Sequence, residues 1–205
     1  MPPVVRLASV NDLAEWRAAA RGLLCAGIPP EAVAWAEPGV ASELFAGTEP
    51  LPPPLVERKV GTVPARFLTL AELAICHRDP ERFDLLYRLL WRLQKDRRIF
   101  LNRDDPDVGK LHRRVQAVAA EGRRMRDTLR FRRAVAGDSH KGLAAWFEPS
   151  HYVLERIAPH FVRAVTHEDW IIATPYRTAF WDGRVLTYGA GRSGSVLPVR
   201  NRSGR

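Results

Sequence analysis

The chain has 205 residues, of which 46% are hydrophobic and 27% are charged, and its formal net charge is +9. These values are typical of a globular protein with a sizeable core, and they exclude global disorder. The two cysteines, Cys25 and Cys76, exclude a disulfide scaffold, a zinc ribbon and a self-contained iron–sulfur site. No apolar run reaches the roughly 18 residues that a membrane span needs, and the first residues lack the layout of a signal peptide. We therefore expect a soluble, cytoplasmic protein.

The first 64 residues predict a strand, a helix and an irregular segment. Val4–Ala8 has the composition of a short strand. A helix is expected next, with Ser9, Asn11 or Asp12 as its N-cap and an end near Ala26. Residues 37–64 are rich in Pro, Gly and Glu, which predicts a surface excursion with polyproline character rather than a domain boundary.

The middle of the chain predicts three helices. The first covers about 66–76. The next two follow Asp79-Pro80 and Asp105-Pro106, because an acceptor side chain followed by proline is a strong signal for a helix start. Apolar residues at helical spacing extend the second of these to about Lys95 and the third to about Arg133.

After residue 140 the pattern becomes mixed. Strands are predicted at 143–147, 170–173, 178–181 and 185–188, and Asp182-Gly183 predicts a hairpin between the last two. A helix opens at Pro149, and Pro159 kinks or ends it. The predicted class is α+β, with a small antiparallel sheet that takes strands from both ends of the chain and packs against a layer of helices, one of them long and basic. We expect a single domain over residues 1–188 and a mobile basic tail over 189–205.

The basic residues are concentrated in one run. Residues 110–133 hold nine Lys or Arg against two acids, and a local excess of this kind is typical of a surface that meets phosphates. The predicted nucleic-acid contacts are Lys110, Arg113, Arg114, Arg123, Arg124, Arg126, Arg130, Arg132 and Arg133. Arg78 and Arg82 lie outside this run and are expected to take no part. The alternative is a solvated helix face whose arginine stems cover the edge of the core.

Aromatic residues crowd the last third of the chain and could stack on exposed bases. They are Trp146, Phe147, His151, Tyr152, Trp170, Tyr176, Phe180 and Trp181. Most are expected in the core, with two or three left for a binding role.

No complete catalytic constellation is present. Glu148-Pro-Ser-His151 matches one Glu-x-x-His element, but a di-iron site needs two such elements and further carboxylates. The Gly189–Gly194 match to the dinucleotide pattern lacks the helix that must follow it. We therefore expect no metal and no cofactor, and the weak catalytic candidates are His77, Glu148 and His151.

Several blocks of the sequence together resemble a known bacterial family. The blocks are Trp16-Arg17-x-Ala-Ala-Arg21, residues 76–93 (CHRDPERFDLLYRLLWRL), Met125-x4-Arg130-Phe-Arg132, Trp146-Phe-Glu-Pro-x-His151, Ala158-Pro-x-Phe161, Trp170-x-Ile-x-Thr-Pro175 and Trp181-Asp-Gly183. The family is a domain of unknown function described as a probable DNA metabolism protein. In many bacteria it precedes a uracil-DNA glycosylase-family domain in one chain, and elsewhere it is encoded beside a radical-SAM protein.

The resemblance implies a role in DNA repair or modification but supplies no catalytic residues. The family commonly has a His-Lys pair where this chain has Arg123-Arg124. The characteristic loops and cluster cysteines of the glycosylase are absent, so we expect no glycosylase activity from this chain alone.

The favoured hypothesis is a DNA-binding accessory module that acts beside a glycosylase-family or radical-SAM partner, without contact with a membrane. Two alternatives stay open. One is a cryptic enzyme that uses Glu148, His151 and His77. The other is a protein-interaction adaptor that docks through the proline-rich residues 50–54 and the tail.

Overall fold

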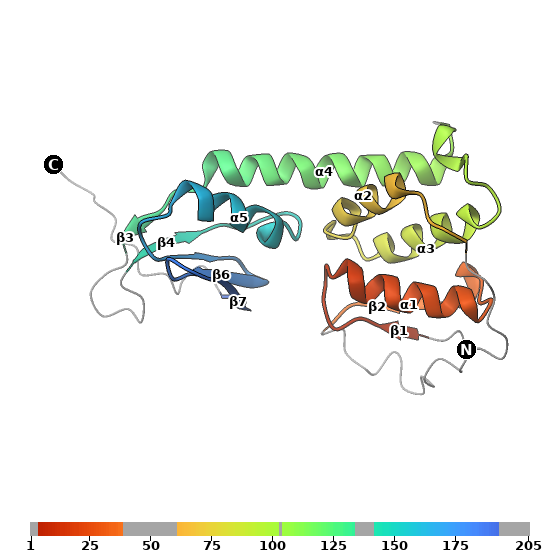
Figure 1. The fold of residues 1–205 in the computed structure, drawn as a ribbon, viewed down its shortest axis with the longest axis horizontal. Helices are drawn as coiled ribbons and strands as arrows, with labels where there is room; N and C mark the ends of the chain where they lie inside the picture. Colours follow the sequence, from red (N-terminus) through yellow and green to blue (C-terminus); the bar gives the residue numbers. More distant parts are fainter. Residues whose placement is uncertain (1–3, 39–60, 103, 134–141, 193–205) are drawn as a thin grey trace. The chain divides into compact units, whose positions relative to one another are not determined.

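The computed structural model describes residues 4–38, 61–102, 104–133 and 142–192. Its elements, in chain order, are β1 (Val4–Arg6), α1 (Leu13–Cys25), η1 (Pro30–Ala32), β2 (Ala34–Ala36), α2 (Ala65–Ala74), α3 (Glu81–Leu93), η3 (Ile99–Leu101), α4 (Pro106–Thr128), β3 (Arg132–Arg133), β4 (Leu143–Trp146), α5 (Leu154–Ala164), β5 (Trp170–Ala173), β6 (Arg177–Trp181) and β7 (Leu186–Ala190) (Figure 1). The α+β prediction is confirmed. The chain forms two compact units, Met1–Val118 and Ala119–Arg205, whose boundary lies inside α4.

The first unit is mainly helical. Asp12 is the N-cap of α1, and its Oδ1 accepts hydrogen bonds from the backbone N–H of Ala14 at 2.8 Å and of Glu15 at 3.2 Å. Gly27, with φ of 68°, follows the end of α1, as glycine commonly does after a helix. α3 packs against α1 and β2, and Figure 1 shows these elements together in the red-to-yellow part of the chain.

Aromatic side chains form the centre of this unit. The Trp35 ring lies 5.9 Å from Trp16 and 5.8 Å from Tyr87 between centroids. The Tyr87 hydroxyl donates to the carbonyl of Ile28 at 2.6 Å, so the polar end of this buried ring is satisfied. The aromatic cluster therefore joins α1, β2 and α3.

The N-terminal strand forms its own sheet. β1 pairs in parallel with β2 in a two-stranded sheet, whereas the C-terminal strands form another sheet. The prediction of one sheet with strands from both ends of the chain is therefore wrong. The physical reason is a pairing partner close in sequence, since Trp35 of β2 is already packed against α1 and α3.

The second unit is built on a five-stranded sheet in the order β3-β4-β5-β6-β7. Three of its pairs are antiparallel, and β4–β5 is parallel. Two parallel neighbours need a crossover connection, which α5 provides. The α5 helix packs against β6, and Cδ1 of Ile157 lies 3.0 Å from where a Cβ on Gly122 of α4 would be. Glycine thus allows α4 to approach α5 closely.

The α5 helix begins five residues later than Pro149 and passes through Pro159 without ending. The backbone N–H of Ser150 donates to Glu121 at 2.7 Å, and that of Leu154 donates to the Tyr176 hydroxyl at 2.8 Å. These tertiary bonds hold the segment before α5 in an irregular conformation. Pro159 cannot donate to the carbonyl four residues earlier, and the Tyr188 hydroxyl donates to that carbonyl of Glu155 at 3.4 Å.

The predicted hairpin at Asp182-Gly183 is confirmed. Asp182 Oδ1 accepts from the backbone N–H of Arg184 at 2.8 Å and of Val185 at 2.6 Å, and Gly183 has φ of 83°. β7 continues to Ala190, two residues beyond the predicted strand end at Tyr188. Of the predicted mobile tail, residues 193–205 lie outside the described residues, as do residues 39–60 of the predicted excursion.

The long helix α4 has the predicted start but not the predicted end. Asp105 Oδ1 accepts from the backbone N–H of Asp107 at 3.0 Å and of Val108 at 3.1 Å, which caps the helix. The helix ends at Thr128, and the prediction of a helix to Arg133 is therefore wrong. After Thr128 the chain turns inward, because the Phe131 ring packs at 5.6 Å from Phe161 and 5.8 Å from Trp170. The expectation of one domain over 1–188 stays a prediction.

Candidate nucleic-acid interface

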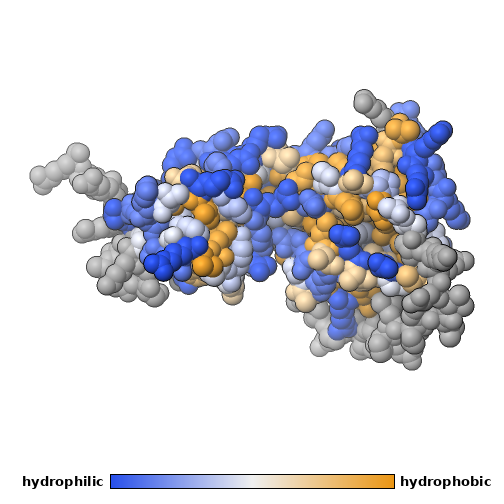
Figure 2. Space-filling view, viewed as in Figure 1, coloured by the Kyte–Doolittle hydropathy of each residue, from blue (hydrophilic) through white to orange (hydrophobic). Residues whose placement is uncertain are grey.

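Exposed arginines gather at the C-terminal end of α4 and on β3, all within the second unit. Arg123 and Arg126 are exposed and three residues apart on α4, so they share a face of the helix. Arg130, Arg132 and Arg133 follow and are also exposed. In Figure 2, hydrophilic residues cover most of the visible surface of this unit.

The exposed arginines differ in what already holds them. Arg130 donates to the carbonyls of Asp127 at 2.7 Å and Leu129 at 3.0 Å, which satisfies acceptors that the helix end leaves open. Arg133 pairs with Glu168 at 3.2 Å. Arg123 and Arg126 form no ion pair within the described residues. These two guanidinium groups are available to an external anion.

Arg124 and Glu121 form a polar network that joins α4 to the segment before α5. Arg124 Nε and one terminal nitrogen donate to the two Glu121 oxygens at 2.9 and 2.5 Å. The same arginine donates to the Glu148 carbonyl at 3.0 Å, and its guanidinium carbon lies 4.5 Å from the centre of the Phe147 ring. Glu121 also accepts from Ser150 N–H at 2.7 Å. This network fixes the segment 147–150 against α4.

The Glu121 carboxyl is stabilised as an anion. Burial by itself raises its pKa, but the hydrogen bonds from Arg124 and Ser150, with the charges of Arg124 and His151, outweigh burial and hold this pKa below its ordinary value. Arg124 donates two hydrogen bonds to this carboxylate. Its side chain is 45% exposed, so only part of it can meet another anion.

The basic residues of α4 in the first unit also include both exposed side chains and one that is paired with acids. Lys110 and Arg113 are exposed. Arg114, predicted to contact phosphates, is 8% exposed and pairs with Asp79 at 2.5 Å and with Glu81 at 3.5 Å. Because its charge is neutralised inside the unit, we leave Arg114 out of the candidate interface.

Arg82, expected outside the interface, is wholly buried. It donates to the carbonyls of Ile75 at 2.9 Å and Val10 at 2.5 Å and pairs with Glu37 at 2.5 Å. Its function is to join segments of the first unit.

The weak catalytic candidates do not form a reactive group within either unit. Glu148 is exposed, and its backbone carbonyl is used by Arg124. His151 is half-buried and lies near Glu121. His77 belongs to the other unit, where its Nδ1 accepts from the Asp79 N–H at 3.2 Å. Among the described residues, no three His, Cys, Asp or Glu side chains could together hold a metal ion.

The aromatic residues of the second unit belong mostly to its core. Phe147, Tyr152 and Trp170 are buried. Four others, Trp146, Tyr176, Phe180 and Trp181, are half-buried.

In the part of the chain that the structure covers, no helix is long and apolar enough to cross a membrane.

The two units differ sharply in charge balance. Residues 1–118 contain 17 Lys or Arg and 15 Asp or Glu, whereas residues 119–205 contain 15 and 8. Most of the excess positive charge therefore belongs to the second unit.

Comparison with known families identifies the chain. Residues 80–188, more than half of its length, match the model of the family described as Domain of unknown function (DUF4130). The chain belongs to this family. Neither a curated protein nor a solved structure matches it. The DUF4130 range includes α3, α4 and the strands β3 to β6, and with them the Glu121–Arg124 network and the exposed arginines.

Sequence reasoning missed the role of Glu121. Its signal was present, since Glu121 stands three residues before Arg124, the spacing at which opposite charges meet on a helix. Glu121 also falls between Val118 and Met125, both of which are buried. An acid on the apolar face of a basic helix indicates an internal partner.

Proposed function

We propose that this chain is a DNA-binding accessory module of a DNA repair or modification system, without glycosylase activity of its own. The description of the resembling family as a DNA metabolism protein supports this direction. So does its association with glycosylase-family and radical-SAM proteins, which are the expected partners.

The observation that carries the proposal is the excess of exposed arginine in the second unit. Arg123 and Arg126 lie on one helical face without ion pairs within the described residues, and Arg132 and Arg133 follow on an exposed strand. Guanidinium groups suit bidentate contact with phosphate oxygens. A duplex presents about one phosphate charge per 1.7 Å of its axis, so closely spaced arginines can each meet one.

The competing explanation is a solvated helix face. In the first unit the cations of α4 follow that pattern in part, because Arg114 is paired with acids. In the second unit the acids are too few to neutralise the arginines. This difference supports an interface on the second unit rather than the first.

Fluorescence anisotropy with a labelled 25-base-pair duplex, measured over a series of salt concentrations, tests this proposal. Each phosphate neutralised contributes about −0.9 to the slope of log affinity against log salt. The double variant Arg123→Gln with Arg126→Gln should reduce the slope by about 2 and weaken binding to all sequences similarly.

The matched control is Arg184→Gln, an exposed arginine of the same unit in the turn between β6 and β7. It should leave affinity and slope near wild type. Equal binding by the double variant and the wild type would contradict the interface. Tighter binding to an RNA duplex of the same sequence would contradict the assignment to DNA.

Absence of uracil release is a separate expectation. Purified protein incubated with a uracil-containing oligonucleotide should give no abasic sites above background, because the glycosylase motifs are missing from the sequence. Clear release would overturn the accessory role.

A further inference from the structure

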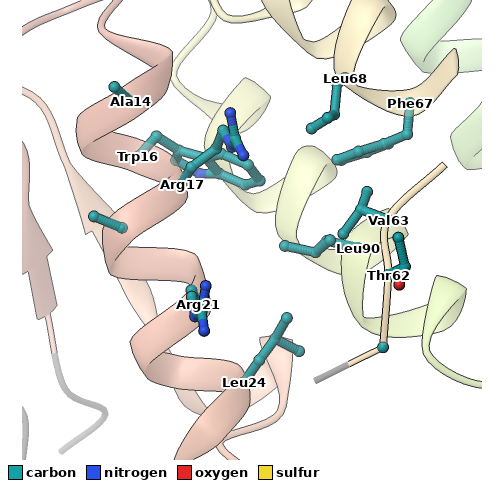
Figure 3. Close-up of a pocket in the computed structure, with 12 residues that line it drawn as sticks. Ala14, Trp16, Arg17, Arg21, Leu24, Thr62, Val63, Phe67, Leu68 and Leu90 are labelled. Atoms are coloured by element: carbon teal, nitrogen blue, oxygen red, sulfur yellow. The ribbon is translucent and has the colours of Figure 1, made fainter. Parts of the chain in front are cut away.

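The first unit contains a pocket unrelated to the arginines of the second. Its volume is about 600 Å³, within the range of about 300–1,000 Å³ that small-molecule sites occupy. Residues of α1, α2 and α3 line it, together with residues 61–63. Figure 3 shows these side chains around the open space.

Two arginines of α1 give the pocket its charge. Arg17 and Arg21 both line it and both are exposed. They stand four residues apart on the helix, so their side chains leave the same face. Figure 3 shows both on the side of α1 that faces the pocket. Neither forms an ion pair within the described residues.

Across from α1 the pocket is apolar. It is lined there by Val63, Leu68 and Leu90, of which Val63 and Leu68 are half-buried and offer surface to a ligand. The segment 61–63 is fixed by a hydrogen bond of 2.9 Å from Gly61 N–H to Gln94 Oε1. This bond ties the segment that carries Val63 to the C-cap residue of α3.

We propose that this pocket binds a small organic anion, with a phosphate or carboxylate head on Arg17 and Arg21 and an apolar body against Val63 and Leu68. Two like charges four residues apart on a helix repel each other, and one anion between them removes that repulsion. Charge-assisted bonds from two guanidinium groups orient the head. Burial of the body against aliphatic side chains adds the hydrophobic contribution.

Three properties of the pocket together support this ligand class. An inorganic anion would use the arginines but leave the aliphatic wall exposed, and a neutral apolar molecule would leave two cations unpaired. A molecule with both parts matches both surfaces. The volume admits a body of one or two rings.

Isothermal titration calorimetry with 1-naphthyl phosphate tests the site on the full chain. We expect saturable binding at one site, and binding of 1-naphthol and of inorganic phosphate at least about tenfold weaker, a difference of about 1.4 kcal/mol. A parallel titration with 1-naphthoate distinguishes the head groups, since the tighter of the two anions identifies the preferred one. Equal affinity for 1-naphthol and 1-naphthyl phosphate would overturn the proposal.

Variants separate the pocket from general attraction to a basic protein. Arg17→Gln with Arg21→Gln should weaken 1-naphthyl phosphate at least about tenfold, and should fold normally because glutamine and arginine have similar helix propensities. The matched control is Arg66→Gln, an exposed arginine of α2 that does not line the pocket. Loss of binding in the control, or none in the double variant, would contradict the site. Circular dichroism verifies that each variant is folded.

Discussion

Among the described residues, the most deeply buried charged side chains of the two units have opposite signs, and both bind backbone groups of irregular segments. In the first, the Arg82 guanidinium is wholly enclosed and reaches carbonyls of Ile75 and Val10. In the second, the Glu121 carboxylate is 6% exposed and receives Arg124 and the Ser150 backbone. Each ion holds an irregular segment that secondary structure does not hold. The comparison teaches that a buried ion in this protein marks a junction between segments.

The units differ in what remains on their surfaces. In the first, ion pairs join Arg88 and Arg92 of α3 to acids at the start of α4. In the second, the acids are about half as many as the cations. The net charge of a sequence segment therefore indicates an interface only when arginines that form internal ion pairs are left out of the count.

The largest expected effect comes from removing the buried cation. Arg82→Gln leaves Glu37 and several carbonyls without their partner, and breaking a buried ion pair costs about 3–5 kcal/mol. At this chain length, about 2–4 °C of melting temperature is lost per kcal/mol, so thermal unfolding followed by circular dichroism should shift by roughly 6–20 °C.

Arg82→Lys keeps the charge but not the planar fork, and should be less destabilised than Arg82→Gln. The control is Arg66→Gln on the surface of α2, expected within about 0.5 kcal/mol of wild type. If all three melt together, Arg82 does not hold the first unit.

The second effect concerns the buried anion. Glu121→Gln removes the charge that receives Arg124, and loss of a hydrogen-bonded charged partner costs about 1–3 kcal/mol. The same measurement should show a loss of roughly 2–12 °C. Glu148→Gln, an exposed acid of the same unit, should leave the melting temperature nearly unchanged, and an equal loss there would contradict the role of Glu121.

The difference between wild type and Glu121→Gln should depend on pH. The folded-state pKa of Glu121 lies below the ordinary 4.5, so its ionised form stabilises the fold above pH 4.5 and that contribution is lost as the pH falls through the folded value. The gap in melting temperature should be constant between pH 6 and 8 and narrow below about pH 4. A gap that widens in acid would show that burial, rather than Arg124, dominates the environment of this carboxyl.

Local signals in the sequence predicted what local forces decide. Asp105 before proline caps α4, and Asp182-Gly183 forms the hairpin, because these hydrogen bonds span only two or three residues. The parallel pairing of β4 with β5 aligns Leu143 with Trp170, and the carbonyl that Pro159 leaves open in α5 accepts from the Tyr188 hydroxyl. These contacts join residues far apart in the sequence.

The candidate interface shows the same limit. The basic run 110–133 predicted Arg114, Arg123 and Arg124 alike as phosphate contacts. The structure separates them. Asp79, 35 residues before Arg114, neutralises Arg114, and Glu121 accepts hydrogen bonds from Arg124. Nothing local to Arg114 identifies its partner, so the sequence overcounted the free cations.

A smaller effect should follow from this difference at Arg114. Arg114→Gln removes the mostly buried guanidinium that pairs with Asp79. Burial by itself raises the pKa of Asp79, but the hydrogen bonds from Arg114 and the Glu81 backbone, with the charge of Arg114, outweigh burial and lower this pKa. We expect a loss of about 1.5 kcal/mol in thermal or urea unfolding, with the salt slope of DNA binding unchanged. A reduced slope would return Arg114 to the interface.

The smallest effect on stability is expected where the effect on binding is greatest. Arg123 and Arg126 are exposed and without ion pairs in the described part of the chain, so the double glutamine variant should unfold within about 0.5 kcal/mol of wild type. In the same preparation the salt slope should fall by about 2. Arg114→Gln should lose stability and keep its DNA binding, whereas the double variant should keep its stability and lose DNA affinity. These two results together would distinguish the structural arginine from the available ones on the same helix. Strong destabilisation of the double variant would instead show that these arginines stabilise the fold as Arg114 does. The proposed interface on the second unit would then be contradicted.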